Sequence, residues 1–165
     1  MVLAAPVTSA RTRGLVQLAQ GAQGFSVNEK GVMQVARTLN NGALHQGVVS
    51  VAGHGGIAGA FMAYMQDSEQ IVSTIDVSTV MEGEQIVVAG GYIVQLLPEV
   101  ERGPLMVMTE RLADFESLDS LLRKGDSPDA LIEEILYGMP FTRLEESSLR
   151  FGCYCSQLRV LSSLA

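Results

Sequence analysis

Residues 86–97 read IVVAGGYIVQLL, and this stretch decides the fold of the chain. It is the most apolar run in the sequence, and Pro98 closes it because proline has no N–H to give to a β-ladder. A continuous apolar run with two adjacent glycines is typical of a strand that is buried on both faces and kinked at Gly90-Gly91. The body of the protein is therefore predicted to be rich in β-structure.

Two β-pairs are predicted, one on each side of a helix. Residues 14–52 are β-rich, and Asn40-Asn41-Gly42 is a strong hairpin signal because Asn and Gly accept a positive φ. A second turn at Glu82-Gly83-Glu84 joins residues 71–80 to the apolar run. Between the pairs, four apolar residues recur at helical spacing and predict one face of an amphipathic helix: Ile57, Phe61, Tyr64 and Met65.

The chain becomes helical and charged after Pro98. Two short helices are predicted at 104–115 and 118–124. A third helix is predicted to start with Ser127 as its N-cap and Pro128 at its first position, and to end at Gly138 and Pro140. The predicted fold class is therefore α+β: a mixed β-sheet body flanked by helices and followed by a helical C-terminal arm.

Composition excludes several classes of protein. The length of 165 residues fits one domain with a real core, and a net charge of −7 argues against a nucleic-acid surface. No apolar run approaches the length of a membrane-spanning helix. Residues 1–13 resemble a transit peptide only weakly and lack the apolar region of a secretion signal. Two cysteines without a disulfide framework favour a reducing compartment, so we expect a cytoplasmic location, with the mitochondrion as the weaker alternative.

The two cysteines are the best chemical clue in the sequence. Cys153 and Cys155 are separated by one residue, and a local turn can aim both thiols at one metal. Two thiolates supply half of a tetrahedral zinc site, which takes four nitrogen or sulfur ligands. The plain alternative is a pair of half-buried free thiols beside Phe151 and Leu158.

Four pieces of the sequence, in order, resemble the heat shock protein 33 family, whose members are redox-switched, zinc-binding holdase chaperones. The pieces are Tyr64, Ser68-Glu69-Gln70, the run from Ala89 to Pro98, and the segment from Arg150 to Ser156. The resemblance covers the chain from about residue 13 to the C-terminus. It divides the chain into a β-rich chaperone core domain at 1–101, a helical linker arm at 102–149 and a truncated start of the zinc-binding redox-switch domain at 150–165.

The resemblance implies a mechanism and assigns its residues. Cys153 and Cys155 match the metal and redox-switch positions, and no residue is assigned to catalysis. Reduced, zinc-loaded thiolates keep the arm folded over a substrate-binding surface. Oxidation forms disulfides and releases zinc, and the unfolded arm bares a surface that holds unfolding client proteins without ATP. The resemblance also implies a homodimer, with exchange of the arms as a possible arrangement.

The chain departs from the family pattern at both ends. Family members carry a substantial segment before the matching part, and a Cys-x-x-Cys pair some thirty residues after the Cys-x-Cys. We therefore expect this chain to be a fragment, a split gene product or a trimmed piece of a longer protein. Two chains that each donate Cys153 and Cys155 would supply the four sulfur ligands of one zinc.

Two other functions stay open at this point. The first is a thiol-disulfide oxidoreductase that uses Cys153 and Cys155, although such enzymes more often carry Cys-x-x-Cys at a helix N-terminus. The second is a non-catalytic scaffold or dimerisation fragment. Gly53-His54-Gly55-Gly56 is predicted to be a turn before the helix, and Asp67 and Glu69 to be solvated or capping carboxylates.

Methionines provide a candidate client surface. Methionine is flexible and polarisable, so it suits surfaces that bind many partners, although filling the core is its default role. Met106 and Met108 on the predicted arm are the better candidates, and Met62 and Met65 are expected in the core.

Overall fold

The computed structural model describes residues 2–4, 11–12, 31–95, 102–125, 127–152, 156–157 and 161. Contacts divide the chain into two compact units, Ser26–Ile135 and a unit that combines Met1–Phe25 with Leu136–Ala165. Among these residues, strands pair in both senses, two pairs antiparallel and two parallel, together with helices α1 to α4. The fold class is therefore α+β, as predicted.

The first half of the larger unit is a β-hairpin covered by a helix. Strands β3 (Val32–Thr38) and β4 (Leu44–Ser50) pair antiparallel around the predicted Asn-Gly turn, where Gly42 has a φ of 81° and Asn41 Oδ1 accepts from the Ala43 N–H at 3.0 Å. Helix α1 (Ile57–Asp67) packs against β4. One face of the hairpin and one face of α1 share a small core, which consists of Val49, Val51, Ala60 and Tyr64 with Met33, Val35, Ala63 and Met65 at its border.

At Gly47 the side chains of α1 lie close against the hairpin backbone. A Cβ atom at this position would clash with the ring of Tyr64 and lie 2.9 Å from Ser68 Oγ. Gly47 itself is buried, and Tyr64 is the largest side chain of this core. The missing side chain of Gly47 therefore makes the space that the Tyr64 ring fills.

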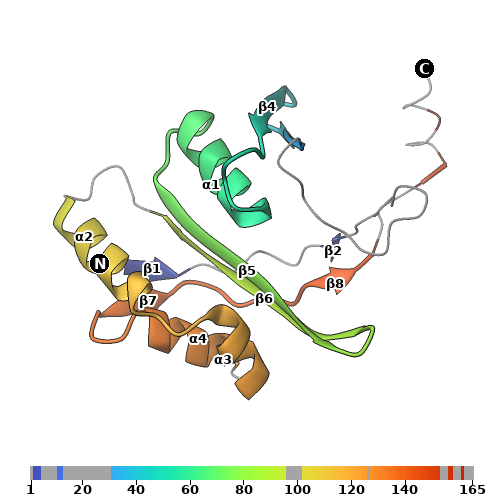
Figure 1. The fold of residues 1–165 in the computed structure, drawn as a ribbon. Helices are drawn as coiled ribbons and strands as arrows, with labels where there is room; N and C mark the ends of the chain where they lie inside the picture. Colours follow the sequence, from blue (N-terminus) through green and yellow to red (C-terminus); the bar gives the residue numbers. More distant parts are fainter. Residues whose placement is uncertain are drawn as a thin grey trace. The chain divides into compact units, whose positions relative to one another are not determined.

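The second half of the larger unit is built on a long two-stranded ribbon (Figure 1). Strands β5 (Ser73–Glu82) and β6 (Gln85–Gln95) pair antiparallel along their whole length, around the predicted turn at Gly83. A register shift between Val80 and Met81 leaves Val87 as the extra residue of a β-bulge. Helix α1 packs on β5, and helix α3 (Leu118–Lys124) packs on both β5 and β6.

Among the described residues, helices of the larger unit follow the ribbon in the sequence. They are α2 (Arg102–Ala113), α3 and α4 (Pro128–Ile135). Ser117 caps α3 through a bond from the Ser120 N–H, and Ser127 caps α4 through a bond from the Ala130 N–H at 3.2 Å, as predicted. Val80, Leu118 and Leu122 form a second core between α3 and the ribbon, bordered by Val88, Tyr92 and Leu131.

Arg111 ties α2 to the end of α4. Its Nη2 atom donates to the backbone carbonyl of Glu134 at 2.8 Å and to the Oε1 atom of the same residue at 3.2 Å. Carbonyls in the last turn of a helix have no partner within the helix, so a guanidinium is a favourable partner for them.

The described strands of the smaller unit are short and parallel. Strand β1 (Val2–Ala4) pairs with β7 (Phe141–Arg143), and β2 (Arg11–Thr12) pairs with β8 (Arg150–Phe151). Within the part of the chain that the structure describes, no helix is long and apolar enough to cross a membrane.

Four expectations from the sequence need correction. Strand β6 is not buried on both faces, because Ile86 and Ile93 are 62% and 63% exposed and α3 covers only the opposite face. The irregularity of the ribbon lies at the bulge rather than at Gly90-Gly91. Helix α1 buries Ala60 and Tyr64, whereas Ile57 and Phe61 are exposed, because the hairpin packs against a face rotated from the predicted one. The first arm helix begins and ends two residues earlier than predicted.

Replacing Gly47 should test the close approach of α1 to the hairpin. We expect Gly47→Ala to lower the free energy of unfolding by about 1–3 kcal/mol, because the new methyl group overpacks the core. Urea denaturation followed by circular dichroism measures this. Gly103→Ala is the control, since an added Cβ in this part of α2 meets no described atom within 4 Å. Equal stability of the two variants would contradict the proposed role of Gly47.

Candidate functional site

A cluster of polar side chains lies where α1 ends. The Tyr64 hydroxyl donates to Glu69 Oε1 at 2.6 Å, and Arg37 Nη2 donates to Glu69 Oε2 at 3.0 Å. His45 Nε2 lies 3.9 Å from Glu69 Oε1, which is too long for a hydrogen bond. The Glu69 side chain is only 14% exposed, so its carboxylate is held between helix and hairpin.

The hairpin register brings the two basic residues of this cluster together. Arg37 on β3 and His45 on β4 are directly opposite partners in the ladder. Directly opposite residues on antiparallel strands project to the same face of the sheet. Both side chains therefore lie near the Glu69 carboxylate, Arg37 at 3.0 Å and His45 at 3.9 Å.

The Ser68-Glu69-Gln70 triplet ends the helix and starts the ribbon. Ser68 is the C-cap, and its N–H donates to the Tyr64 carbonyl. Gln70 has a φ of 57°, the only positive value among the described residues other than glycine. The next N–H, of Ile71, returns to the Met65 carbonyl at 2.9 Å. The left-handed residue thus reverses the chain and holds Glu69 against the hairpin.

The chemistry of this cluster favours a structural role. The hydrogen bond from Tyr64, assisted by the charge of Arg37, lowers the pKa of the Glu69 carboxyl, and the same bond raises the pKa of the Tyr64 phenol. A carboxylate with a lowered pKa is a poor general base near neutral pH. Glu69 therefore ties helix α1 to the hairpin and is neither solvated nor capping, contrary to expectation, whereas Asp67 is exposed as expected of a solvated carboxylate.

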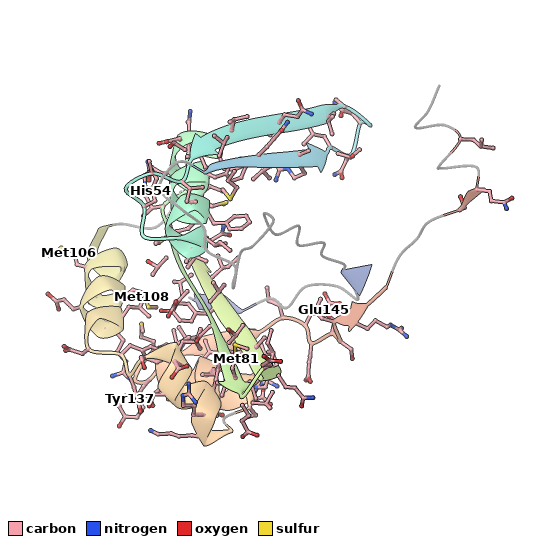
Figure 2. All side chains as sticks on the ribbon, turned by 45° about the vertical axis from the view of Figure 1, so that its right-hand side comes forward. His54, Met81, Met106, Met108, Tyr137 and Glu145 are labelled. Atoms are coloured by element: carbon pink, nitrogen blue, oxygen red, sulfur yellow. The ribbon has the colours of Figure 1, made fainter. Side chains whose placement is uncertain are left out.

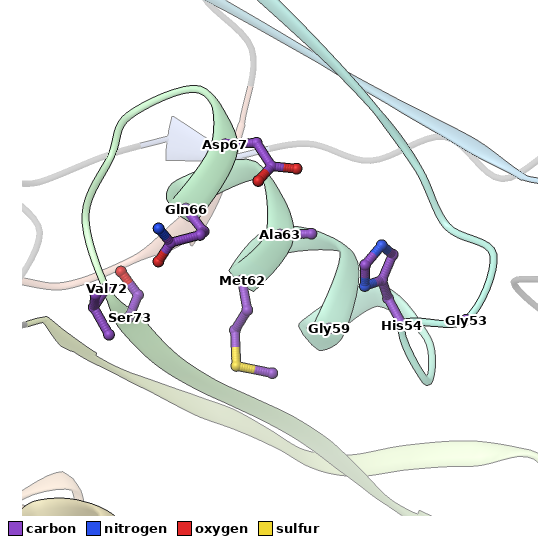
Figure 3. Close-up of a pocket in the computed structure, with 9 residues that line it drawn as sticks. All are labelled: Gly53, His54, Gly59, Met62, Ala63, Gln66, Asp67, Val72 and Ser73. Carbon is purple, nitrogen blue, oxygen red and sulfur yellow. The ribbon is translucent and has the colours of Figure 1, made fainter. Parts of the chain in front are cut away.

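A shallow hollow lies beside α1 (Figure 3). Its volume is about 500 Å³, and His54, Met62, Gln66 and Asp67 are among the residues that line it. The glycines of the preceding loop have positive φ values, and Gly56 is the N-cap of α1, so Gly53-His54-Gly55-Gly56 is the predicted turn before the helix. Among the described residues, no group of three or more His, Cys, Asp or Glu side chains could hold a metal ion.

Apolar side chains are exposed on two parts of the larger unit. On the β5–β6 ribbon, the exposed residues are Val77, Met81, Ile86, Val87 and Ile93. On α2, Met106 is 64% exposed, whereas Met108 is buried (Figure 2). Met108 is therefore not part of an accessible surface, contrary to the sequence-based expectation, because it faces inward one half-turn from Met106.

Charged side chains on α3 and just before it are paired with one another. Arg123 Nε donates to Asp119 Oδ2 at 2.7 Å, and Lys124 Nζ donates to Glu116 Oε2 at 2.6 Å. The bond from Lys124, followed by one from Ser120, lowers the pKa of the Glu116 carboxyl. Exposed pairs of this kind contribute little to stability.

The predicted metal and redox residues, Cys153 and Cys155, lie outside the described residues. The described residues next to them in the sequence are strand β8 and Gly152 before them and Ser156 after them. The donor set is known from the sequence: two thiolates fit two of the four ligand positions of a structural zinc. The zinc assignment stays a prediction.

The family model described as Hsp33 protein matches residues 1–165. This chain belongs to the Hsp33 family. Two of the segments that resemble the family, Tyr64 and Ser68-Glu69-Gln70, supply the Tyr64 and Glu69 side chains of the polar cluster at the end of α1, called the helix-end cluster below.

Relatives cover most of this chain with about half of their own length. A protein named 33 kDa chaperonin from Syntrophotalea carbinolica is 34% identical over 140 residues, which are 84% of this chain and 48% of the relative. The 33 kDa chaperonin of Bacillus subtilis is 31% identical over 148 residues, which are 82% of this chain and 50% of the relative. The chain thus spans about half the length of these Hsp33 relatives.

A solved structure has the same fold. The 33 kDa chaperonin (heat shock protein 33 homolog) of Thermotoga maritima matches with a TM-score of 0.69 and 22% identity, over 90% of this chain and 52% of that chain. Its likeness supports the arrangement of strands and helices described above.

Sequence reasoning missed two members of the cluster. No role was assigned to Arg37 or His45 from the sequence alone. The hairpin turn could have predicted that these two residues are cross-strand neighbours, because Arg37 and His45 each lie four residues from Asn41.

The pH dependence of stability should reveal the Glu69 tie. Because the pKa of Glu69 is lowered by folding, its carboxylate stabilises the native state above the unfolded-state pKa of about 4.3. This contribution is lost as the pH falls through the lower native pKa. We expect the urea midpoint of Glu69→Gln to be below that of the parent at pH 7 and to decline less between about pH 5 and pH 3.

Glu133→Gln is the matched control, since Glu133 is an exposed residue of α4. Its pH profile should follow that of the parent chain. Parallel profiles for Glu69→Gln and the parent would refute the tie.

Proposed function

We propose that this chain is part of a redox-regulated, ATP-independent holdase that binds unfolding proteins under oxidative stress. The observation that carries the proposal is membership of the Hsp33 family, matched over residues 1–165, together with relatives named 33 kDa chaperonin. These names describe chaperones and not enzymes, so no catalytic residue is assigned. The chain acts in the cytoplasm and has neither nucleic acid nor membrane as a partner.

The exposed apolar residues support client binding. Unfolding proteins expose apolar segments, and a surface that removes these segments from water gains free energy roughly in proportion to the area buried. One face of the ribbon carries Val77, Thr79 and Ala89. Large exposed apolar side chains also lie on this face, and no charged residue of β5 or β6 lies between them. Met106 and Val107 add exposed apolar area on α2.

The switch is assigned to Cys153 and Cys155. Peroxide oxidises the two thiolates to a disulfide and is itself reduced to two hydroxide ions. A disulfide between residues one position apart closes a small ring away from relaxed geometry, so it should be readily reduced. Zinc, when bound by these thiolates, keeps them deprotonated and contributes folding energy to the segment that carries them.

The arm is the segment that the switch controls. Outside α3, the described helix residues of the arm with buried apolar side chains are Met108 on α2 and Ile135 on α4, and Arg111 joins these two helices through its bonds to Glu134. Segments with so few buried apolar side chains open at low free energy. The partners in this scheme are unfolded client proteins and a second copy of the chain, in which the arms could be exchanged.

Client protection before and after oxidation tests the function. We expect the chain to suppress the light scattering of a chemically unfolded enzyme on dilution without ATP, and to do so more strongly after treatment with peroxide at mild heat. The double variant Cys153→Ser, Cys155→Ser is the control and should show no increase with peroxide. No protection in either state would reject the holdase; equal protection in both would reject the switch alone.

Metal analysis tests the zinc assignment. If two chains combine their cysteines, reduced protein purified without chelator should contain about one zinc per two chains, because four thiolates complete one site. The variant Cys153→Ser should lose the metal. Absence of zinc from the reduced parent chain would overturn the two-chain site.

A further inference from the structure

Two exposed methionines lie on the surfaces to which client binding is assigned. Met81 on the ribbon is 49% exposed and Met106 on α2 is 64% exposed, whereas Met108 is buried (Figure 2). The other methionines that the structure describes are half-buried: Met33, Met62, Met65 and Met139. Oxidants in solution reach an exposed thioether sulfur more readily than a buried one, so Met81 and Met106 are the described methionines most open to oxidation.

Met81 belongs to the apolar face of the ribbon. The ladder places Met81 of β5 directly opposite Ile86 of β6, which is 62% exposed. Directly opposite residues of an antiparallel pair project to the same face, and residues two positions apart on a strand do so as well. Met81 therefore shares its face with Ile86, Thr79 and Val77, and a change at its sulfur alters the surface that a client would contact.

Helix α2 presents one methionine to solvent and holds another inside. Met106 and Met108 are two residues apart, so their side chains leave the helix about 200° from each other. Met106 is exposed on one side, and Met108 on the other side is 8% exposed. The two thioethers thus have the same chemistry and almost the same sequence context, and they differ in access to solvent.

We propose that Met81 and Met106 are sites of reversible oxidation by hypochlorous acid, and that their sulfoxides weaken the binding of clients. In this reaction each sulfur atom gains one oxygen atom and loses two electrons. Hypochlorous acid accepts the electrons and leaves as a chloride ion and a proton. The effect on client binding rests on the holdase function proposed above, whereas the oxidation itself does not.

A sulfoxide changes what this surface can bury. The thioether of methionine is apolar and polarisable, and its sulfoxide is polar and accepts hydrogen bonds from water. Covering a polar group with an apolar client segment costs free energy unless a new hydrogen bond replaces the lost one. The Met81 and Met106 side chains are already in contact with water, so their oxidation should weaken binding without unfolding the chain.

Oxidation at these methionines acts in the opposite direction to oxidation at the cysteines. In the proposed function, oxidation of Cys153 and Cys155 increases client binding. Sulfoxides at Met81 and Met106 decrease it, and sulfoxide reductases can restore the thioethers. The two kinds of sulfur would therefore set a lower and an upper limit to the oxidant level at which the chain holds clients.

Peptide mapping tests the modification sites. The full chain with Cys153→Ser and Cys155→Ser, whose thiols no longer consume oxidant, is treated with limiting hypochlorous acid. A glutamate-specific protease then yields peptide 70–82, whose one methionine is Met81, and peptide 102–110, which contains Met106 and Met108. We expect Met81 and Met106 to gain an oxygen atom about tenfold or more faster than Met108, as read by tandem mass spectrometry.

The synthetic peptide 102–110 is the control for intrinsic reactivity. Without the fold, its two methionines should be oxidised at similar rates. Oxidation of Met108 as fast as Met106 in the folded chain would overturn the proposal, and so would a rate for Met81 no higher than that for Met108.

Client protection tests the consequence. The variant Met81→Leu, Met106→Leu keeps apolar side chains of similar size that cannot form sulfoxides. Before treatment it should suppress the light scattering of an unfolded enzyme as well as the parent does. After treatment with hypochlorous acid, the parent should require about threefold or more chain than the variant for the same suppression. The cysteines are the same in both chains, so this difference reports the methionines.

The single variant Met108→Leu is the matched control and should respond to hypochlorous acid as the parent does. Methionine sulfoxide reductase should return the treated parent to the level of the leucine variant. Equal protection by the treated parent and the treated leucine variant would refute the effect on clients. Loss of the circular dichroism signal in the treated parent would assign the effect to unfolding and overturn it as well.

Failure of the holdase function is distinguishable from failure of this proposal. Absence of protection from every chain, treated or untreated, rejects the holdase and with it the effect on clients. The peptide map still decides whether Met81 and Met106 are the oxidation sites, because it measures mass and not binding.

Discussion

The hydrogen-bond ladder between β5 and β6 is the constraint on which the larger unit depends. A hairpin alone is marginally stable in water, so the ribbon needs a helix on at least one face. Helix α3 supplies it through Leu118 and Leu122, which pack against Val80. Helix α1 joins the same ribbon through β5, and therefore the β3–β4 hairpin that α1 covers is also anchored to it. The two small cores are linked by this one ladder.

The turns and helix caps were predicted correctly from the sequence, because they depend on residues that are adjacent or nearly adjacent in the chain. The turn at Asn41-Gly42 and the cap at Ser127 depend on backbone conformation and on side chains within three residues. Burial was read less well, as the exposed Ile93 and Phe61 show. Which side of a strand or helix is covered depends on residues far away in sequence, and hydrophobicity alone does not identify them.

The helix-end cluster illustrates the same limit for a site. Tyr64 and Glu69 were noticed as family-like residues, but their roles depend on Arg37, which only the strand register brings near. Cys153 and Cys155 present the opposite case. Their chemistry is clear from residue type alone, and the described residues add the neighbouring strand β8 but no geometry of the thiols. The redox proposal therefore rests on the family, whereas the Glu69 tie rests on distances.

The bond from Arg111 to the carbonyl of Glu134 has a consequence for how this chain can diverge. Its shorter bond to Glu134, at 2.8 Å, is with the main chain, which every residue at position 134 would provide. The glutamate can thus be exchanged over evolutionary time with little penalty, while the arginine has no equivalent substitute, since lysine lacks the planar fork. Among related sequences, position 134 should therefore vary freely, whereas position 111 should remain arginine.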